Sequence, residues 1–301
     1  MQVLLMMTLF VAAASGQRPA PAELPQLRIE APPELEYLRM RFESSDPSLL
    51  AGVLELVGLN APGPAIRVVL VPEISDMARD VAPWIAGFFR SGTDAVVMFP
   101  ARTPAYPHNS LEDVLRHEVA HVMIERAAGG QQVPRWFNEG LAMAAERSRN
   151  FEDETRALYQ FVVGPAASLA ELERLFSAGQ DSQAILDRAY ALSAAFVRDL
   201  IQEHGQAAPG RILERMRNGA PFDRAFTIIT GQTPGEAESR FWQRQRIWTT
   251  WVPIITSSAA VWALVTVIAL LAIRRRRQKD AAMRRKWDEE EPDNPDQWLD
   301  Y

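Results

Sequence analysis

The sequence predicts an α+β protein with one C-terminal transmembrane helix, and three observations lead to this prediction. Short apolar runs rich in β-branched residues occur before residue 100. Helix start and stop signals follow from residue 110 onwards, and an uncharged run of 23 residues lies near the C-terminus. Strands first and helices after them is the element order typical of α+β folds.

Composition narrows the possible function classes. The chain has 301 residues, a formal net charge of −6 and no cysteine. An acidic chain lacks the basic surface that nucleic-acid binding needs. Without cysteine there is no disulfide framework, no thiolate zinc site and no cysteine nucleophile. Histidines and carboxylates must therefore hold any metal, and two of the four histidines stand four residues apart.

The N-terminus has the pattern of an export signal. Residues 3–14 form a short uncharged apolar run, and small residues follow it up to Gly16. This pattern predicts a signal peptide over residues 1–16, although it lacks the usual positive charge at its start. A buried N-terminal strand or helix is the alternative. The proline-rich residues 17–33 are expected to form a linker to a domain over residues 34–247.

Three segments of that domain are predicted to be strands. Ile66–Pro72 and Asp94–Pro100 are apolar and β-branched, which is typical of buried strands. Trp84–Phe89 is a possible third strand. From residue 110 the pattern becomes helical, with helices predicted over 110–128, 134–147 and 183–204, and with further helices opening at Ser168 and Thr233.

The uncharged run Trp251–Ile273 is long enough to span a hydrocarbon core of about 30 Å. Trp248 and Trp251 stand where an interfacial aromatic belt is expected, and Arg274–Arg277 follow at once, so we predict a transmembrane helix over 248–273 with its C-terminus in the cytoplasm. A buried core helix is the alternative. Residues 274–301 hold eight basic and eight acidic residues and are expected to be a disordered tail.

These two hydrophobic segments together predict the location of the protein. A cleaved signal and one span place residues 17–250 outside the cytoplasm. We therefore expect a single-pass protein of a bacterial inner membrane, with its folded domain in the periplasm.

The sequence His117-Glu118-Val119-Ala120-His121 lies on the helix predicted over 110–128. Residues four apart share a helix face, so both imidazoles can bind one metal at about 2.0–2.1 Å. Glu118 is rotated by about 100° from His117, where it can reach a water on that metal and act as a general base. Two unrelated histidines on an amphipathic helix are the alternative.

A second motif supplies a third ligand. Glu139 stands in Pro134-Arg-Trp-Phe-Asn-Glu-Gly-Leu-Ala142, about one and a half turns into the next helix. Two antiparallel helices would bring its carboxylate opposite the histidine pair, and Gly140 would let the second helix approach closely. Two histidines and one glutamate with an open fourth position are the ligand set of catalytic zinc.

These two motifs at this spacing resemble the gluzincin group of zinc metallopeptidases, in particular the peptidase-MA-like families, and the resemblance covers about residues 95–200. It implies a zincin-like fold, with a small mixed sheet above a helical lower lobe. It also implies Zn²⁺ on His117, His121 and Glu139, Glu118 as the catalytic base, and a tyrosine from a later helix near the oxyanion. Tyr190 is the candidate for that tyrosine, although it could instead be a core residue.

The sequence departs from the family in two respects. No glutamate motif for binding a substrate amino terminus precedes His117, which favours an endopeptidase over an aminopeptidase. No acidic residue stands three or four positions after Glu139, so Glu125 and Glu146 are the candidates to support the ligands. His108 is interpreted as a loop residue and not a ligand, and His204 as a residue at a helix C-terminus.

The sequence therefore predicts a membrane-anchored zinc peptidase that cleaves peptide or protein substrates outside the cytoplasm. An extended substrate is expected to add to a sheet edge, either Ala95–Phe99 or Ile85–Phe89. The alternative is a catalytically silent zincin-fold module that binds peptides or acts as a chaperone at the membrane.

Overall fold

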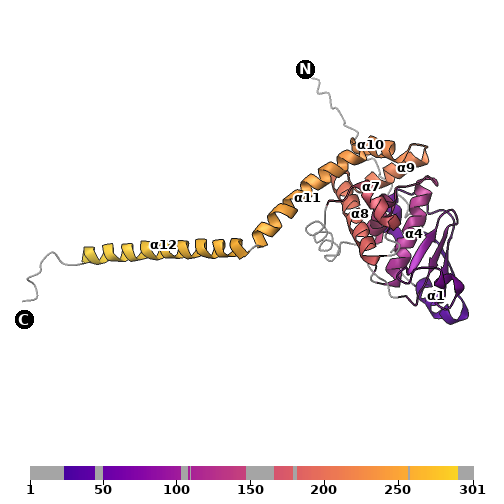
Figure 1. The fold of residues 1–301 in the computed structure, drawn as a ribbon, viewed down its shortest axis with the longest axis horizontal. Helices are drawn as coiled ribbons and strands as arrows, with labels where there is room; N and C mark the ends of the chain where they lie inside the picture. The colour runs from indigo at the N-terminus through magenta and orange to yellow at the C-terminus, as the bar shows by residue number, and fades with distance from the viewer. Residues whose placement is uncertain are drawn as a thin grey trace, which may run out of the picture. The chain divides into compact units, whose positions relative to one another are not determined.

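The computed structural model describes residues 24–44, 50–102, 108, 110–146, 166–178, 182–256 and 258–290. The predicted signal peptide lies outside these residues. The chain divides into two units that separate after Phe241, and each is described by itself. Figure 1 shows the first unit, in which the sheet and a group of helices lie side by side.

The sheet of the first unit has four short strands in the order β1-β2-β4-β3. They are β1 (Leu27–Glu30), β2 (Ile66–Leu70), β3 (Gly87–Arg90) and β4 (Ala95–Met98). β1, β2 and β4 are parallel, whereas β3 pairs antiparallel with β4 and forms an edge of the sheet. The small mixed sheet predicted from the sequence is therefore confirmed.

Two details of the sheet differ from what the sequence predicts. Leu27–Glu30 lies within the predicted linker but forms β1, because its backbone pairs with β2 and Ile29 is buried. Ala95–Phe99 is not an edge, because β4 has neighbours on both sides and all four of its residues are buried. β3, which overlaps the other candidate, Ile85–Phe89, holds the edge position instead.

The described residues form eleven α-helices and one short 3-10 helix. The predicted helices are confirmed as α4 (Leu111–Ala127), α5 (Arg135–Glu146), α7 (Leu169–Ala178), α8 (Gln183–His204) and α11 (Pro234–Thr256). The others are η1 (Pro33–Leu35), α1 (Glu36–Glu43), α2 (Ala51–Val57), α3 (Asp76–Arg79), α9 (Ala208–Arg217), α10 (Phe222–Thr230) and α12 (Ser258–Glu290).

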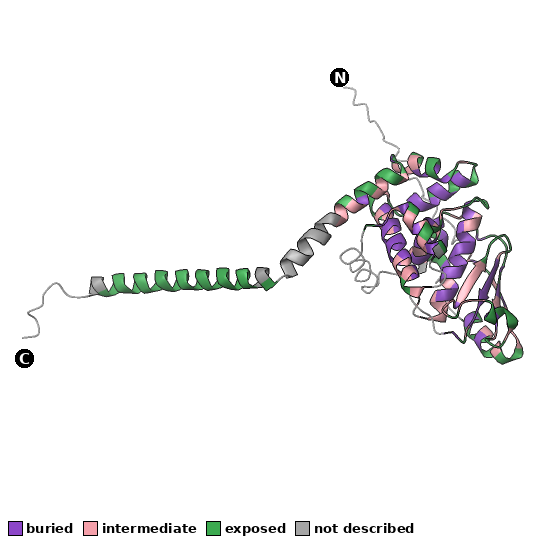
Figure 2. Ribbon diagram, viewed as in Figure 1, coloured by how far each residue is buried: buried purple, intermediate pink, exposed green. Residues whose placement is uncertain are grey.

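Helix α4 is the centre of the first unit, because it packs against both the sheet and the helices. It contacts β3 and β4 on one side and α5 on another, and it is largely buried (Figure 2). Its start is defined by Ser110, whose hydroxyl oxygen accepts a hydrogen bond from the Asp113 backbone N–H at 3.1 Å. Gly129 and Gly130, both at positive φ, end the helix and turn the chain towards α5.

Helix α5 packs most closely against α8 at Gly140. A Cβ atom on Gly140 would lie 2.5 Å from both the Ser193 carbonyl oxygen and a methyl carbon of Val197. From the sequence, the small size of Gly140 is expected to serve the approach of α5 to α4, but the tight contact is with α8. The glycine therefore fixes the distance between α5 and α8.

A buried arginine holds the segment that leads into β3. The guanidinium of Arg102 donates hydrogen bonds to the backbone carbonyls of Ala78, Ala82 and Ile85, at 2.6, 2.8 and 2.9 Å. It also forms an ion pair with Glu73 at 2.9 Å. Because the guanidinium has partners on several sides, its burial is compensated, and the turn before the edge strand is fixed to the body of the sheet.

The second unit contains most of α11 and all of α12. Among the residues that the structure describes, none of the helices combines the length and apolarity needed to cross a membrane. Ser257, which lies inside the predicted span Trp251–Ile273, is not described. Residues 274–290 belong to α12 and not to a disordered tail, because they are rich in Arg, Lys, Ala and Glu, which favour helix.

Replacing Gly140 with alanine is expected to lower the free energy of unfolding by about 1–3 kcal/mol, because the new methyl group forces α5 away from α8. Urea denaturation followed by circular dichroism measures this change. Gly52 in α2 serves as the control, because a Cβ atom added there would have nothing within 4 Å. Equal stability of Gly140→Ala and Gly52→Ala would contradict the tight contact.

Candidate metal centre

Two buried imidazoles on α4 form the first half of the centre. His117 and His121 are 2% and 9% exposed, and the contacts of α4 with the sheet and α5 enclose them. Their ring centroids are 4.7 Å apart and their planes are nearly perpendicular. The i, i+4 spacing therefore brings both rings to one face of the helix, as the sequence predicts.

Helix α5 brings the carboxylate of Glu139 against both rings. Glu139 Oε2 lies 3.3 Å from His117 Nε2 and 3.4 Å from His121 Nε2. Two ligand atoms that are each about 2.0–2.1 Å from a tetrahedral ion are separated by about 3.3–3.4 Å. The two measured separations therefore equal those of a tetrahedral site, and the three ligand atoms face one another.

The donor set and its burial fit a divalent metal ion. Glu139 is 7% exposed, and no hydrogen-bond donor among the described residues is aligned on its Oε2. A buried carboxylate oxygen without such a donor requires a positive charge beside it. Two imidazole nitrogens and one carboxylate oxygen are ligands that zinc accepts, and they leave a fourth position for water or substrate.

The charge state of Glu139 also fits a metal-binding site. Burial alone raises the pKa of a carboxyl group, but His121 and His117 outweigh this effect and hold the pKa of Glu139 well below its ordinary value. The group is therefore an anion under ordinary conditions, and deprotonation is a requirement for binding a metal.

Asn138 supports one of the ligands, and it is not among the residues predicted from the sequence. Its side-chain oxygen lies 2.8 Å from His121 Nδ1. In the tautomer with the proton on Nδ1, this nitrogen donates to Asn138 and leaves Nε2 free to bind a metal. The signal in the sequence is the position of Asn138 directly before Glu139 on a helix that faces the histidines.

One of the two supporting residues expected from the sequence, Glu125, has its partners elsewhere. The carboxylate of Glu125 accepts hydrogen bonds from the Ser91 hydroxyl and the Gly92 N–H, which belong to the turn between β3 and β4. Glu146 is the last residue of α5, its side chain is not among those described, and its supporting role stays a prediction. A different residue, Arg135, approaches the second oxygen of Glu139, with Nε 3.5 Å from Oε1.

Glu118 lies beside the edge strand and not among the three converging ligands. It is buried, and its Cγ would lie 3.4 Å from a Cβ atom on Gly87 of β3. The next residue but one on the same face of β3, Phe89, stacks on His121 with the ring centroids 6.4 Å apart. β3 therefore runs along the centre, and Gly87 leaves room for α4, because a Cβ atom there would lie 2.8 Å from a methyl carbon of Val114.

Tyr190 on α8 lies beside the ring of His117. Their ring centroids are 6.2 Å apart, and Phe176 of α7 contacts the tyrosine ring. Burial raises the pKa of the Tyr190 hydroxyl well above its ordinary value, and the charges of Glu139 and Glu118 raise it further. The hydroxyl therefore keeps its proton, which it can donate in a hydrogen bond.

His108 also lies beside the centre. Its ring is edge-to-face with that of His117, with the centroids 4.7 Å apart, although the sequence indicates only a loop residue at this position. Among the described residues it is not part of the group whose ligand atoms converge, and its exclusion as a ligand stays a prediction.

This arrangement defines the class of gluzincin-type metallopeptidase sites. Two histidines lie on one helix, the glutamate that joins them, Glu139, lies on the next, and Glu118 stands beside them without being one of the three converging groups. The comparison with protein families agrees with this class. Residues 103–246 match the family model of the Peptidase MA superfamily, and this part of the chain is a Peptidase MA superfamily metallopeptidase domain. No curated protein matches the chain.

Replacing Asn138 with alanine is expected to weaken zinc binding roughly 10- to 100-fold, because His121 loses the partner that fixes its ring and tautomer. Competition against a chromogenic chelator measures the affinity. Asn218→Ala at the exposed end of α9 is the matched control. If both variants bind zinc as tightly as the wild type, Asn138 does not support the site.

Proposed function

We propose that this protein is a membrane-anchored zinc endopeptidase that cleaves peptide bonds outside the cytoplasm. The observation that carries the catalytic part is the position of Glu139 Oε2, which lies 3.3 and 3.4 Å from the two histidine nitrogens. Membership of the Peptidase MA superfamily supports a peptide or protein substrate.

Zinc is the proposed ion because of the ligand types. A site of two imidazoles and one carboxylate is typical of catalytic zinc, whereas magnesium and calcium prefer oxygen ligands. When bound at this site, zinc would lower the pKa of water and polarise the scissile carbonyl.

The residues around the metal supply the proton transfers. The Glu118 carboxylate accepts a proton from the attacking water, and it then returns this proton to the nitrogen of the leaving amine. The Tyr190 hydroxyl, whose raised pKa keeps it protonated, donates a hydrogen bond to the oxygen on which negative charge develops. His117, His121 and Glu139 would hold the metal.

The edge strand offers a place for an extended substrate. β3 has β4 on one side, and its other backbone edge faces away from the sheet. A peptide added to that edge would pass both Gly87, beside Glu118, and Phe89, beside His121. Because such pairing continues on both sides of the cleaved bond, it favours an endopeptidase.

The anchoring part of the proposal rests on the sequence and on α12. Trp251–Ile273 carries no charge, and Arg274–Arg277 follow it. On α12 the apolar side chains are exposed, for example Trp262 at 70% and Leu264 at 61%. Apolar side chains all round a helix favour a lipid environment, and the arginines favour the cytoplasmic side.

Replacing Glu118 with glutamine is expected to retain zinc and to lower the rate of peptide hydrolysis by about 10²- to 10⁴-fold, because no base accepts the proton of water. A quenched-fluorescence peptide library measures hydrolysis, and mass spectrometry of the native protein measures zinc. Glu125→Gln on the same helix should hydrolyse peptides like the wild type. Hydrolysis that persists in zinc-loaded Glu118→Gln would rule out its role as the base.

Replacing Tyr190 with phenylalanine is expected to lower kcat by roughly 10²-fold and to leave KM and zinc content unchanged, because only the transition state loses a hydrogen bond. Steady-state kinetics on one library substrate separate the two constants. Tyr37→Phe on the exposed surface of α1 is the control. An unchanged kcat would assign Tyr190 to packing alone.

The proposed topology can be tested with single cysteines, because the chain has none of its own. In intact spheroplasts, a membrane-impermeant maleimide is expected to label Ser239→Cys but not Gln278→Cys, and both after the membrane is made permeable. Equal labelling of the two positions before that step, or release of the protein by an alkaline wash, would contradict the anchored arrangement.

A further inference from the structure

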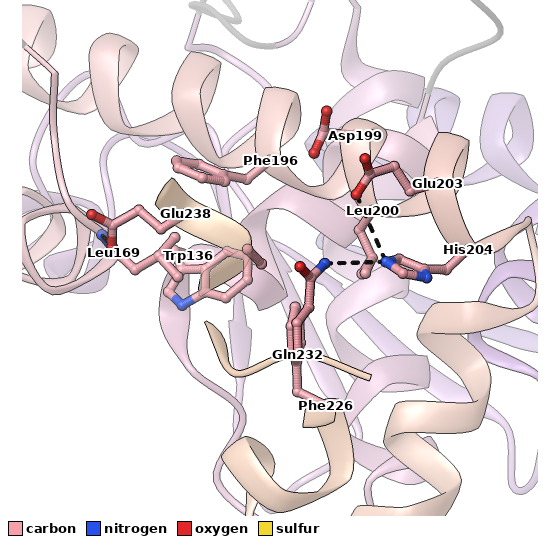
Figure 3. A pocket seen from close by; sticks show the side chains of 11 residues that line it. Trp136, Leu169, Phe196, Asp199, Leu200, Glu203, His204, Phe226, Gln232 and Glu238 are labelled. Carbon is pink, nitrogen blue, oxygen red and sulfur yellow. Dashed lines mark hydrogen bonds and ion pairs between the residues drawn. The ribbon is translucent and has the colours of Figure 1, made fainter. Parts of the chain in front are cut away.

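A small cavity lies away from the metal ligands, between the C-terminal half of α8 and the start of α11 (Figure 3). Within it, the centre of a water molecule can occupy a volume of about 20 Å³. The empty volume of the whole cavity, including its opening to solvent, is about 330 Å³. A single water needs about 10–15 Å³ on the first measure, so the inner part accommodates a group slightly larger than water.

The inner wall holds a buried amide with an acceptor that has no partner. Gln232 is 3% exposed, and its Oε1 has no hydrogen-bond donor in the described structure. Its amide nitrogen lies 3.3 Å from His204 Nε2, so the oxygen is turned away from His204 and towards the side of Trp136. Thr230 fixes the backbone of Gln232 through hydrogen bonds to its N–H and C=O.

The rest of the lining is aromatic and acidic. The carboxylates come from Asp199, Glu203 and Glu238, and the rings from Trp136, Phe196 and Phe226. His204 also lines the cavity, and its Nε2 lies 3.8 Å from Glu203 Oε2. The described residues that line the cavity include no lysine or arginine. Glu238 is held in place because its carboxylate accepts a hydrogen bond from the Leu169 N–H at 3.0 Å.

A cation with N–H donors interacts more favourably with the lining residues of this cavity than a neutral group does. Its N–H groups can bond to Gln232 Oε1, its charge is favoured by the surrounding carboxylates, and the aromatic faces attract cations. A water could bond to the amide oxygen but would gain nothing from the carboxylate charge or from the rings. The size of the inner cavity suits the end of an alkyl chain, CH₂–NH₃⁺.

We propose that this cavity is a binding site for a primary alkylammonium group, such as a lysine side chain or a small free amine. Gln232 supplies the buried acceptor, and Asp199 and Glu238 supply the negative charge. The site is separate from the metal centre and does not depend on the peptidase reaction.

Ligand-observed NMR titration of the full-length protein with n-butylammonium chloride tests the site. We expect saturable binding with a Kd on the order of millimolar, given five non-hydrogen atoms. n-Butanol keeps the shape without the charge, and tetramethylammonium keeps the charge without N–H donors, so both should bind at least about tenfold more weakly. Equal binding of n-butanol, or no saturable binding of n-butylammonium, overturns the proposal.

Replacing Gln232 with methionine keeps the chain length and removes the acceptor, so n-butylammonium binding should weaken about tenfold or more. Gln131→Met, at an exposed glutamine, should bind like the wild type. If the Gln232 variant fails to fold, Asp199→Asn provides the second test through the loss of charge. Unchanged affinity in the folded Gln232 variant, or in Asp199→Asn where that variant provides the test, overturns the proposal.

The natural source of the group is distinguished with two small compounds. Nα-acetyl-lysine methylamide carries a free ammonium group, whereas its Nε-acetyl derivative does not. Binding of the first compound alone supports the side chain of a protein lysine as the ligand. Binding of n-butylammonium without either lysine compound supports a small free amine.

Discussion

The structure depends on one electrostatic constraint, which is the burial of the Glu139 carboxylate between two imidazoles. An anion in such a place costs on the order of several kcal/mol unless positive charge compensates it. The imidazoles compensate in part, as the lowered pKa of Glu139 reflects. A divalent ion at the same point would complete the compensation and link α4 to α5, so metal binding and the stability of this helix pair are coupled.

The sheet contributes by holding its edge strand in a fixed place along the centre. Arg102 fixes the turn before β3 through three backbone carbonyls, and Glu73 balances its charge. Gly87 then lies against Glu118 and Phe89 against His121. A substrate strand added to this edge, as proposed, would meet a fixed template that sets the orientation of its backbone.

Much of the centre follows from local rules that a sequence displays. The positions of His117, His121 and Glu139 are set by helical periodicity and by a short loop between two helices, and both can be read directly. Asn138 is harder to identify, because its role depends on how α5 is rotated about its own axis. The same is true of Gly140, since the sequence does not tell which neighbouring helix it faces.

Features that depend on distant pairing could not be predicted. Leu27–Glu30 looks like part of a proline-rich linker, and only its register with β2 makes it a strand. The choice between Ala95–Phe99 and Ile85–Phe89 as the edge depends on the strand order, which local patterns do not encode. His108 precedes α4 in sequence, and local patterns do not encode its tertiary contact with His117.

The contact between Gly140 and Ser193 also links the position of Glu139 to that of Tyr190. Glu139 precedes Gly140 on α5, and Tyr190 stands one turn before Ser193 on α8. At Gly140 the α5 backbone lies against the Ser193 carbonyl and the Val197 side chain of α8, so the carboxylate and the phenol belong to two helices in direct contact. Parting these helices would separate Glu139 from Tyr190, so the proposed reaction requires that α5 and α8 stay in contact.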